Sequence, residues 1–294
     1  DSDPKKIFSI TKRSIEFIEE NKKNKTPFFL QISHYAIHSD IIARKTTYEK
    51  FKNKKLGKIH DNIGLASMTY DLDESIGIIL DKLRELDLEK NTYIIYSSDN
   101  GSVPTIPPRK YYEQSYNYPL KRGKWDALEG GIRVPFIIMG PGINNKRFIN
   151  TPISFSDLLP TIVDLAGNIN LKNKDLDGGS FKDLILKKTN KVKRKTKGLI
   201  FHVPYENKIA GERAHSVIIL KNMKLVKYHD NNEVQLYNVI KDLEEKNDLS
   251  KRFFKTAKKL ENKLLDYLQK VKAPKWKKGI SWKKNSLRII DSYY

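Results

Sequence analysis

The stretch MTYDLDESIGIILDKLRELDLEKNTYIIYSSDNG, residues 68–101, decides the fold. After a turn at 87–91, residues 92–98 (TYIIYSS) form a continuous β-branched and aromatic run, which predicts a buried strand. A long helix followed by a buried strand is typical of an α/β layer architecture. The helix is predicted from apolar residues at i, i+3, i+4 spacing, which are Leu65, Met68, Leu72, Ile76, Ile79, Leu80, Leu83 and Leu86.

The flanking sequence adds elements of the same two kinds. Ahead of the long helix, a breaker (NKKNKTP) separates a periodic apolar pattern from the short apolar run FFLQIS, which predicts a helix and then a buried strand. The further elements expected in this part of the chain are a helix at 6–22, a strand at 28–33, a loop at 34–40, a Pro- and Tyr-rich loop at 102–118, a strand at 136–139 and a capped helix at 154–166.

A basic, low-complexity segment, KKTNKVKRKTK at 187–197, is the expected domain boundary. It separates a larger α/β domain at 1–190 from a small α+β domain at 198–294 that ends in an irregular basic tail. The elements expected in the small domain are strands at 198–203, 216–220, 223–228 and 235–239 and a helix at 253–271.

Composition bounds the class of protein. The 294 residues are 38% hydrophobic, and the apolar runs are far shorter than the roughly 20 residues of a membrane helix. With no cysteine, disulfides, thiolate metal sites and cysteine nucleophiles are excluded for this chain. The chain begins DSDPKKIFSI, with no initiator Met and no signal-like segment, so we expect it to start within a domain, and its localisation cannot be read directly.

The net charge of +21 admits three interpretations. A basic surface could bind nucleic acid, but no nucleic-acid motif accompanies it and the lysines are spread along the chain. The interpretation we favour is a lysine-rich solvated surface. The charge could also attract a polyanionic substrate such as a sulfated polysaccharide.

Two polar residues follow the strand predicted at 92–98. Asp99 and Asn100 offer a carboxylate and an amide oxygen, which are hard ligands suited to Ca²⁺, or to Mg²⁺ in its place. They stand where ligands gather in open α/β sheets, although Asx-Gly is also common turn chemistry. Two ligands are too few for a tight site, and the carboxylates of Asp157 and Asp164 are better explained as helix-cap or helix-surface groups.

Lys124 and His38 are the other candidates. Lys124 lies in a glycine-flanked loop, where a lysine can neutralise an oxyanion, although a lone lysine in so basic a chain is weak evidence. His38 lies in the loop after the first predicted strand and could act as a general acid or base, although loop histidines more often cap or face solvent. His34 is less well placed, because it directly follows the predicted strand and its neighbours lie at the end of that strand.

The order of these blocks carries more information than any one of them. FFLQISHYAIHSD, the stretch at 68–101, PLKRGKWDALEGGIRVPFIIMGPG, SFSDLLPTIVDLAG, LDGGSF and EVQLYNVIKDLEEKNDLS resemble, in the same order, blocks of the type I (formylglycine-dependent) sulfatases. The resemblance covers roughly residues 10–272 and is closest to arylsulfatase or N-acetylgalactosamine-6-sulfatase-like members. It implies an alkaline-phosphatase-like α/β sandwich with a central mixed sheet, followed by a smaller α+β domain with a short antiparallel sheet.

The resemblance also implies roles. Asp99 and Asn100 match two Ca²⁺ ligands of the family, and Lys124 matches the lysine that contacts the sulfate group. His38 matches the histidine that binds the sulfate ester and protonates the leaving oxygen. The residues carried only as candidates for substrate contact are His202 and Arg213.

The departures from the family concern the nucleophile. The family's Cys- or Ser-x-Pro-x-Arg motif, which yields formylglycine, and its first pair of metal-binding aspartates are not found here. Asp40 also stands where a proline is usual after the histidine. We therefore expect a C-terminal portion of a sulfatase that has no activity by itself, with the missing N-terminal half as a partner.

The expected reaction is hydrolysis of a sulfate ester of an aryl or carbohydrate substrate, without a nucleic-acid or membrane partner. One alternative is a phosphatase or phosphonate hydrolase of the alkaline-phosphatase superfamily, which an upstream nucleophile motif would distinguish. Another is a non-catalytic module for polyanions, whose binding should survive Asp99→Ala. The family resemblance suggests a periplasmic or extracellular location.

Overall fold

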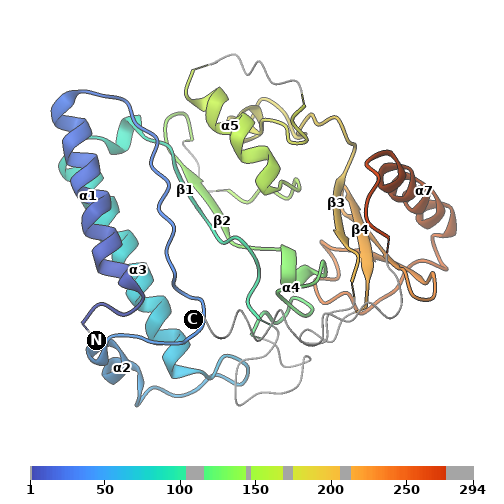
Figure 1. Ribbon diagram of the computed structural model, residues 1–294, viewed down its shortest axis with the longest axis horizontal. Coiled ribbons are helices and arrows are strands. Elements are labelled where there is room, and N and C mark those ends of the chain that lie inside the picture. The colour runs from blue at the N-terminus through green and yellow to red at the C-terminus, as the bar shows by residue number, and fades with distance from the viewer. Residues whose placement is uncertain (1, 104–115, 144–146, 168–174, 206–212, 276–294) are drawn as a thin grey trace. The chain divides into compact units, whose positions relative to one another are not determined.

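A computed structural model of the protein describes residues 2–103, 116–143, 147–167, 175–205 and 213–275 (Figure 1). Most of the expected 102–118 loop and the basic tail from residue 276 lie outside these ranges. The helices are η1 (Pro4–Lys6), α1 (Ile7–Asn24), α2 (Lys45–Phe51), α3 (Ile63–Glu85), η2 (Glu89–Asn91), α4 (Glu129–Ile132), η4 (Phe155–Asp157), α5 (Leu158–Leu165), α6 (Lys182–Ile185) and α7 (Phe254–Lys270). The strands are β1 (Ile94–Ser97), β2 (Phe136–Met139), β3 (Leu199–Val203), β4 (His215–Leu220), β5 (Met223–Tyr228) and β6 (Val234–Asn238).

The chain forms two compact units. The first contains Asp1–Tyr96 and Ile137–Asn144, and the second contains Ser97–Phe136 and Asn145–Tyr294. The chain therefore passes to the second unit within β1 and returns within β2. The domain boundary expected at 187–197 lies inside the second unit and stays a prediction.

The first unit is built on α1 and α3, which pack side by side as Figure 1 shows. Buried Ile18 of α1 meets Ile79 and Leu83 of α3, and these three residues form the centre of the core. A buried hydrogen bond of 2.6 Å between the hydroxyls of Thr11 and Ser75 also joins the two helices. The apolar periodicity in the sequence thus predicted both helices and the faces that they bury.

The expected strand at 28–33 is wrong. Residues 28–33 have no regular secondary structure, although Phe28, Leu30 and Ile32 alternate inward and pack on the core of α1 and α3. The alternation that suggested a strand is real, but a strand also needs a neighbour to supply its ladder of hydrogen bonds. Within the described part of the chain, this segment has no strand partner.

The second unit contains the antiparallel sheet β3-β4-β5-β6, in sequence order. Helix α7 covers one face, where buried Leu260 and Leu264 join Ile218 and Leu225 of the sheet. The expected short antiparallel sheet and its helix are confirmed.

On the sheet's other face, Val217 and Val226 pack against Ala127 and Leu128. These two residues come from a loop closed by the hydrogen bond from Gly130 N to Lys121 O, 2.7 Å. We call residues 121–130 the lysine loop, because Lys124 lies within it. The core of the small sheet is thus also the support of this loop.

A capping box begins the helical segment η4–α5. The Ser154 side chain accepts from the Asp157 backbone, and the Asp157 carboxylate accepts from the Ser154 N–H at 2.8 Å. The capped helix expected at 154–166 is therefore confirmed. Among the described residues, no helix combines the length and the apolar character that crossing a bilayer requires.

Candidate functional site

The residues after β1 offer two oxygen ligands. Asp99 is exposed and makes no hydrogen bond or ion pair with another described residue. The Asn100 Nδ2 donates to Gly101 O at 3.0 Å, so the amide is oriented by its own loop. A carboxylate and an amide carbonyl oxygen are therefore presented side by side in sequence at the end of a strand.

The lysine loop and Gly131, the residue after it, contact the two residues that follow this pair. Gly101 N donates to Gly131 O at 3.0 Å, and Lys124 N donates to Ser102 O at 2.9 Å. A Cβ added at Gly101 would meet Gly130 O at 1.6 Å, a separation that no real side chain tolerates. The loop of Asp99 and Asn100 and the loop of Lys124 are thus held together by backbone contacts, and glycine is required where they meet.

Asn117 adds a side-chain bridge to the same junction. Its Oδ1 accepts from Ser102 N at 3.0 Å, and its Nδ2 donates to Ser102 O at 2.9 Å and to Arg122 O at 2.8 Å. One amide therefore ties the two loops together a second time.

The backbone on either side of Lys124 is unusual. Arg122 and Trp125 have φ values of 60° and 81°, in the left-handed region that side chains other than glycine seldom occupy. An ion pair of 3.2 Å between Arg122 and buried Asp126 helps to hold this conformation. The Lys124 ammonium lies 5.8 Å from the centre of the Trp125 ring. Strain of this kind persists where the surrounding structure fixes a loop, and it clusters at functional sites.

His38 belongs to the first unit, in an exposed loop. Its Nδ1 donates to the backbone oxygen of Ser39 at 3.0 Å, which in the neutral ring puts the proton on Nδ1. Burial lowers the pKa of His34, four residues earlier, and in the described structure its Nδ1 has no hydrogen-bond partner. His34 is therefore held neutral near pH 7. That His38 meets Asp99, Asn100 and Lys124 stays a prediction.

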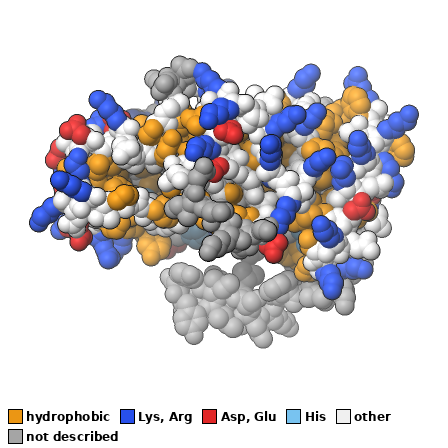
Figure 2. All heavy atoms as spheres, turned by 90° about the horizontal axis from the view of Figure 1, so that it is seen from above, with side chains coloured by type: hydrophobic (Ala, Val, Ile, Leu, Met, Phe, Trp, Pro, Cys, Tyr) orange, Lys and Arg blue, Asp and Glu red, His pale blue; other side chains and the backbone are white. Residues whose placement is uncertain are grey.

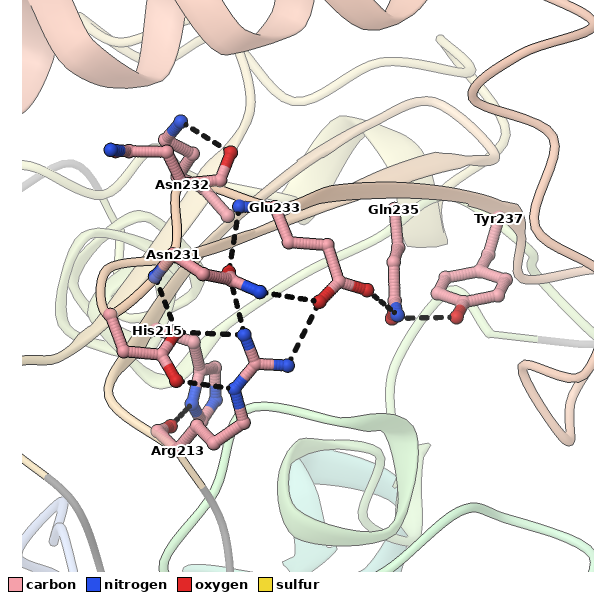
Figure 3. A network of polar contacts seen from close by, with 9 residues as sticks. Arg213, His215, Asn231, Asn232, Glu233, Gln235 and Tyr237 are labelled. Atoms are coloured by element: carbon pink, nitrogen blue, oxygen red, sulfur yellow. Dashed lines mark hydrogen bonds and ion pairs between the residues drawn. The ribbon is translucent and has the colours of Figure 1, made fainter.

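His202 and Arg213 are engaged within the small sheet. His202 contacts Ser216 Oγ through Nδ1 at 2.6 Å and Pro274 O through Nε2 at 2.7 Å. The Arg213 guanidinium binds Asp230 and Glu233, and Figure 3 shows it directed at Glu233 and Asn231. These ion pairs raise the pKa of Arg213 further. Contact of either residue with substrate stays a prediction.

The histidines around Ser216 make stability depend on pH. Burial lowers the pKa of His229 from its ordinary 6.5 to about 4, with added repulsion from His202, His215 and Lys227. The unfolded chain binds this proton below pH 6.5 and the folded chain only near pH 4, so stability is lost as pH falls through that window. We expect a loss of about 1–2 kcal/mol between pH 7.5 and 4.5, because the ring is half-exposed and screened.

Denaturant unfolding of the protein and of His229→Gln at both pH values measures this effect. The variant should lose less stability on acidification than the parent. An equal loss in both proteins would show that His229 does not carry the pH dependence.

The structure limits the carboxylates available to a cation. Asp157 is fully buried and engaged, since it accepts from Gly179 N at 2.9 Å and pairs with Arg194 at 2.6 Å, so its assignment as a helix-cap group is confirmed. In the described part of the chain, no three His, Asp or Glu side chains are grouped so as to hold a metal ion. Asp99 and Asn100 suit a hard cation chemically, but they supply only two of the six to eight oxygens that Ca²⁺ takes.

Sequence reasoning missed a buried charged cluster on the small sheet. Lys224 of β5 is fully buried, with its Nζ 3.0 Å from Glu129 Oε1 and 2.9 Å from Glu245 Oε1. The only signal in the sequence was a lysine within the strand MKLVKY, where long charged side chains usually face solvent.

Comparison with known proteins identifies similar chains. A family model described as "Sulfatase" matches residues 8–169, and one described as "N-sulphoglucosamine sulphohydrolase, C-terminal" matches residues 123–277. A sulfatase of Formosa agariphila is 28% identical over 298 residues, which cover 94% of this chain and 51% of that protein. The N-acetylgalactosamine-6-sulfatase of Mus musculus is 30% identical over 170 residues, covering 57% of this chain and 30% of that enzyme.

A solved structure has a fold similar to that of this chain. Ps i-CgsB in complex with k-i-k-neocarrahexaose superposes with a TM-score of 0.77 and 25% identity, covering 92% of this chain and 56% of that one. The expected α/β fold is thereby confirmed. The chain spans about half the length of the Formosa agariphila sulfatase and of Ps i-CgsB, and its match covers less than a third of the mouse enzyme.

Proposed function

Because the chain belongs to the sulfatase family, we propose that it provides sulfate binding and leaving-group protonation for the hydrolysis of a sulfate ester. The observation that carries this proposal is the junction of the two loops, where Gly101 N and Lys124 N donate to the facing loop's backbone. That junction puts a strained, lysine-bearing loop beside a carboxylate and an amide, which is the arrangement that an anionic sulfate ester and a cation require together.

Each residue has a chemical task in this proposal. Lys124 neutralises the sulfate oxygens, and its ammonium is suited to a compact oxyanion. His38 holds a proton for the ester oxygen as the alcohol leaves. Asp99 and Asn100 would contribute to holding Ca²⁺, which when bound polarises the sulfate oxygens as a Lewis acid.

Members of this family generally depend on a metal ion and a formylglycine residue. The chain offers no place for the latter, because it has no cysteine and no Ser-x-Pro-x-Arg sequence. We therefore expect the purified 294-residue chain to show no turnover of an aryl sulfate, since loss of the covalent step costs many powers of ten. A release assay for the phenol over hours measures this, and turnover above that of a heat-denatured sample would contradict it.

Binding can be tested without turnover. We expect Lys124→Ala to weaken the affinity for an aryl sulfate, measured with Ca²⁺ present, by about tenfold, because a charged hydrogen-bond donor is lost. Lys255→Ala, which removes an exposed lysine of α7, is the matched control and should leave affinity unchanged. Equal affinity in Lys124→Ala and the parent protein would remove Lys124 from the proposed site.

The same experiment separates the cation site from general attraction by charge. We expect Asp99→Ala to abolish the Ca²⁺ dependence of binding. Salt-sensitive binding of a sulfated glycan that survives this change would instead favour a polyanion-binding surface.

For the substrate class we propose a sulfated carbohydrate. The solved relative holds a neocarrahexaose, and another relative is named a ulvan-active sulfatase of Formosa agariphila, 26% identical over 197 residues. Figure 2 shows Lys and Arg side chains spread over the face seen from above, which together with the net charge of +21 would attract an anionic polymer. A periplasmic or extracellular location, where such polymers occur, belongs to the same proposal.

A further inference from the structure

A buried cluster of charges that the proposed reaction does not use lies against β5 of the small sheet. Lys224, Glu129 and Glu245 are 0%, 2% and 1% exposed, and the Lys224 ammonium lies between the two carboxylates. Arg133 adds a second cation on Glu129. A buried charge is costly unless it is paired, so three buried charged side chains in one place need an explanation.

The electrostatics of the cluster keep Glu129 ionised. Burial acts to raise the pKa of Glu129, but the charges of Lys224 and Arg133 outweigh burial and lower it. At Glu245, burial dominates and raises the pKa. Glu129 is therefore the partner of Lys224 that stays ionised. The burial of Glu245 costs hydration energy, which its contacts with Lys224 and the Glu129 N–H must offset.

Glu245 contacts both ends of the lysine loop. The Glu129 N–H donates to its Oε2 at 2.8 Å, and the Lys121 ammonium donates to its backbone oxygen at 3.1 Å. Lys121 and Gly130 are joined to each other by the hydrogen bond that closes the loop. Glu245, which follows β6, therefore holds together the two ends of the loop that bears Lys124.

The backbone at Glu245 supports a specific task for its side chain. Its φ of 49° lies in the left-handed region, where glycine or asparagine would be less strained. A glutamate persists in such a conformation when its side chain is needed at that place.

The end of the lysine loop also leads to a contact with the residue that follows the proposed cation ligands. Gly131, which follows Gly130 at the end of the lysine loop, accepts from the N–H of Gly101, which directly follows Asn100. A path of direct contacts therefore runs from Lys224 through Glu129 to both loops of the proposed site.

We propose that Lys224, with Glu129 and Glu245, is a positioning residue that fixes the lysine loop so that Lys124 meets the sulfate group. This inference rests on the proposed function. The small sheet is then a part of the sulfate-binding apparatus, because its strand β5 sets the place of a residue on the lysine loop. Lys224 acts through Glu129 and Glu245 and does not itself touch the substrate.

The test uses Lys224→Met, Lys124→Ala and the double variant, with affinity for an aryl sulfate measured with Ca²⁺ at a temperature where each protein is folded. We expect Lys224→Met to weaken binding about tenfold, which is the usual effect of losing a group that supports a ligand-contacting residue. The double variant should bind no more weakly than Lys124→Ala alone, because the cluster acts only through Lys124.

Arg194→Met is the matched control. It also removes a partly buried cation from a buried carboxylate, that of Asp157, in the same unit. We expect it to lower stability and to leave the affinity of the folded protein unchanged, as a merely structural role would. If Lys224→Met does not fold, Glu245→Gln, which keeps the shape and an acceptor for the Glu129 N–H, takes its place with the same expected loss.

The outcomes separate the two proposals. Loss of affinity in Lys124→Ala with none in folded Lys224→Met or Glu245→Gln overturns the positioning role and leaves the proposed function standing. Equal affinity in Lys124→Ala and the parent overturns the proposed function itself.

Discussion

Gly101→Ala is expected to destabilise the protein by about 4 kcal/mol, at the upper end of the effects of single substitutions. The added Cβ would lie 1.6 Å from Gly130 O and 2.7 Å from the Gly130 carbonyl carbon, so the two loops must separate. Because the obstacle is backbone on both sides, no change of side-chain rotamer relieves it. Urea unfolding measures the loss.

Gly77→Ala is the control. Gly77 lies within α3, and an added Cβ there would meet nothing within 4 Å. Alanine should therefore stabilise the helix by about 0.5–1 kcal/mol. If Gly101→Ala were as well tolerated as Gly77→Ala, the close junction of the two loops would be wrong.

Asp157→Ala is expected to cost about 3–5 kcal/mol of unfolding free energy. The change removes the capping box with Ser154, leaves Gly179 N without its acceptor and deprives the partly buried Arg194 of its carboxylate. Asp164→Ala changes a residue of α5 whose side chain makes no contact of this kind with another described residue, and it should change stability by less than about 0.5 kcal/mol. Thermal unfolding compares the two variants.

A metal role for Asp157 makes the opposite prediction. In that case, Asp157→Ala would weaken Ca²⁺ binding while the stability of the cation-free protein stayed near that of the parent. Such a result would contradict the assignment of this aspartate to a helix cap.

Local periodicity was sufficient for the helices and for the small sheet. The apolar spacing predicted α1, α3 and α7 to within a few residues, and β2 and β5 were predicted at their observed bounds. These elements bury one face each, so a short window of sequence contains the information. The segment 28–33 shows the limit of prediction from local periodicity. Its alternation of apolar and polar residues indicates which side chains are buried, but strand formation also depends on a neighbouring strand from elsewhere in the chain.

The candidate site also has one part that the local sequence predicted and another part that it did not. Asp99, Asn100 and Lys124 were recognisable because they follow a strand or lie among glycines. The contact of Gly101 with Gly131 and the burial of Lys224 between Glu129 and Glu245 join residues far apart in the chain. No periodicity encodes such contacts, which is why the support of the lysine loop could not be predicted.

The most direct test of a shared sulfate site is an NMR titration of the chain with an aryl sulfate in the presence of Ca²⁺. Four backbone amides report on the question, those of His38, Asp99, Asn100 and Lys124. We predict that all four shift with one common midpoint, and that Lys124→Ala moves this midpoint for all of them. Separate midpoints, or a His38 amide that does not respond while Lys124 does, would show that these residues do not share one sulfate site.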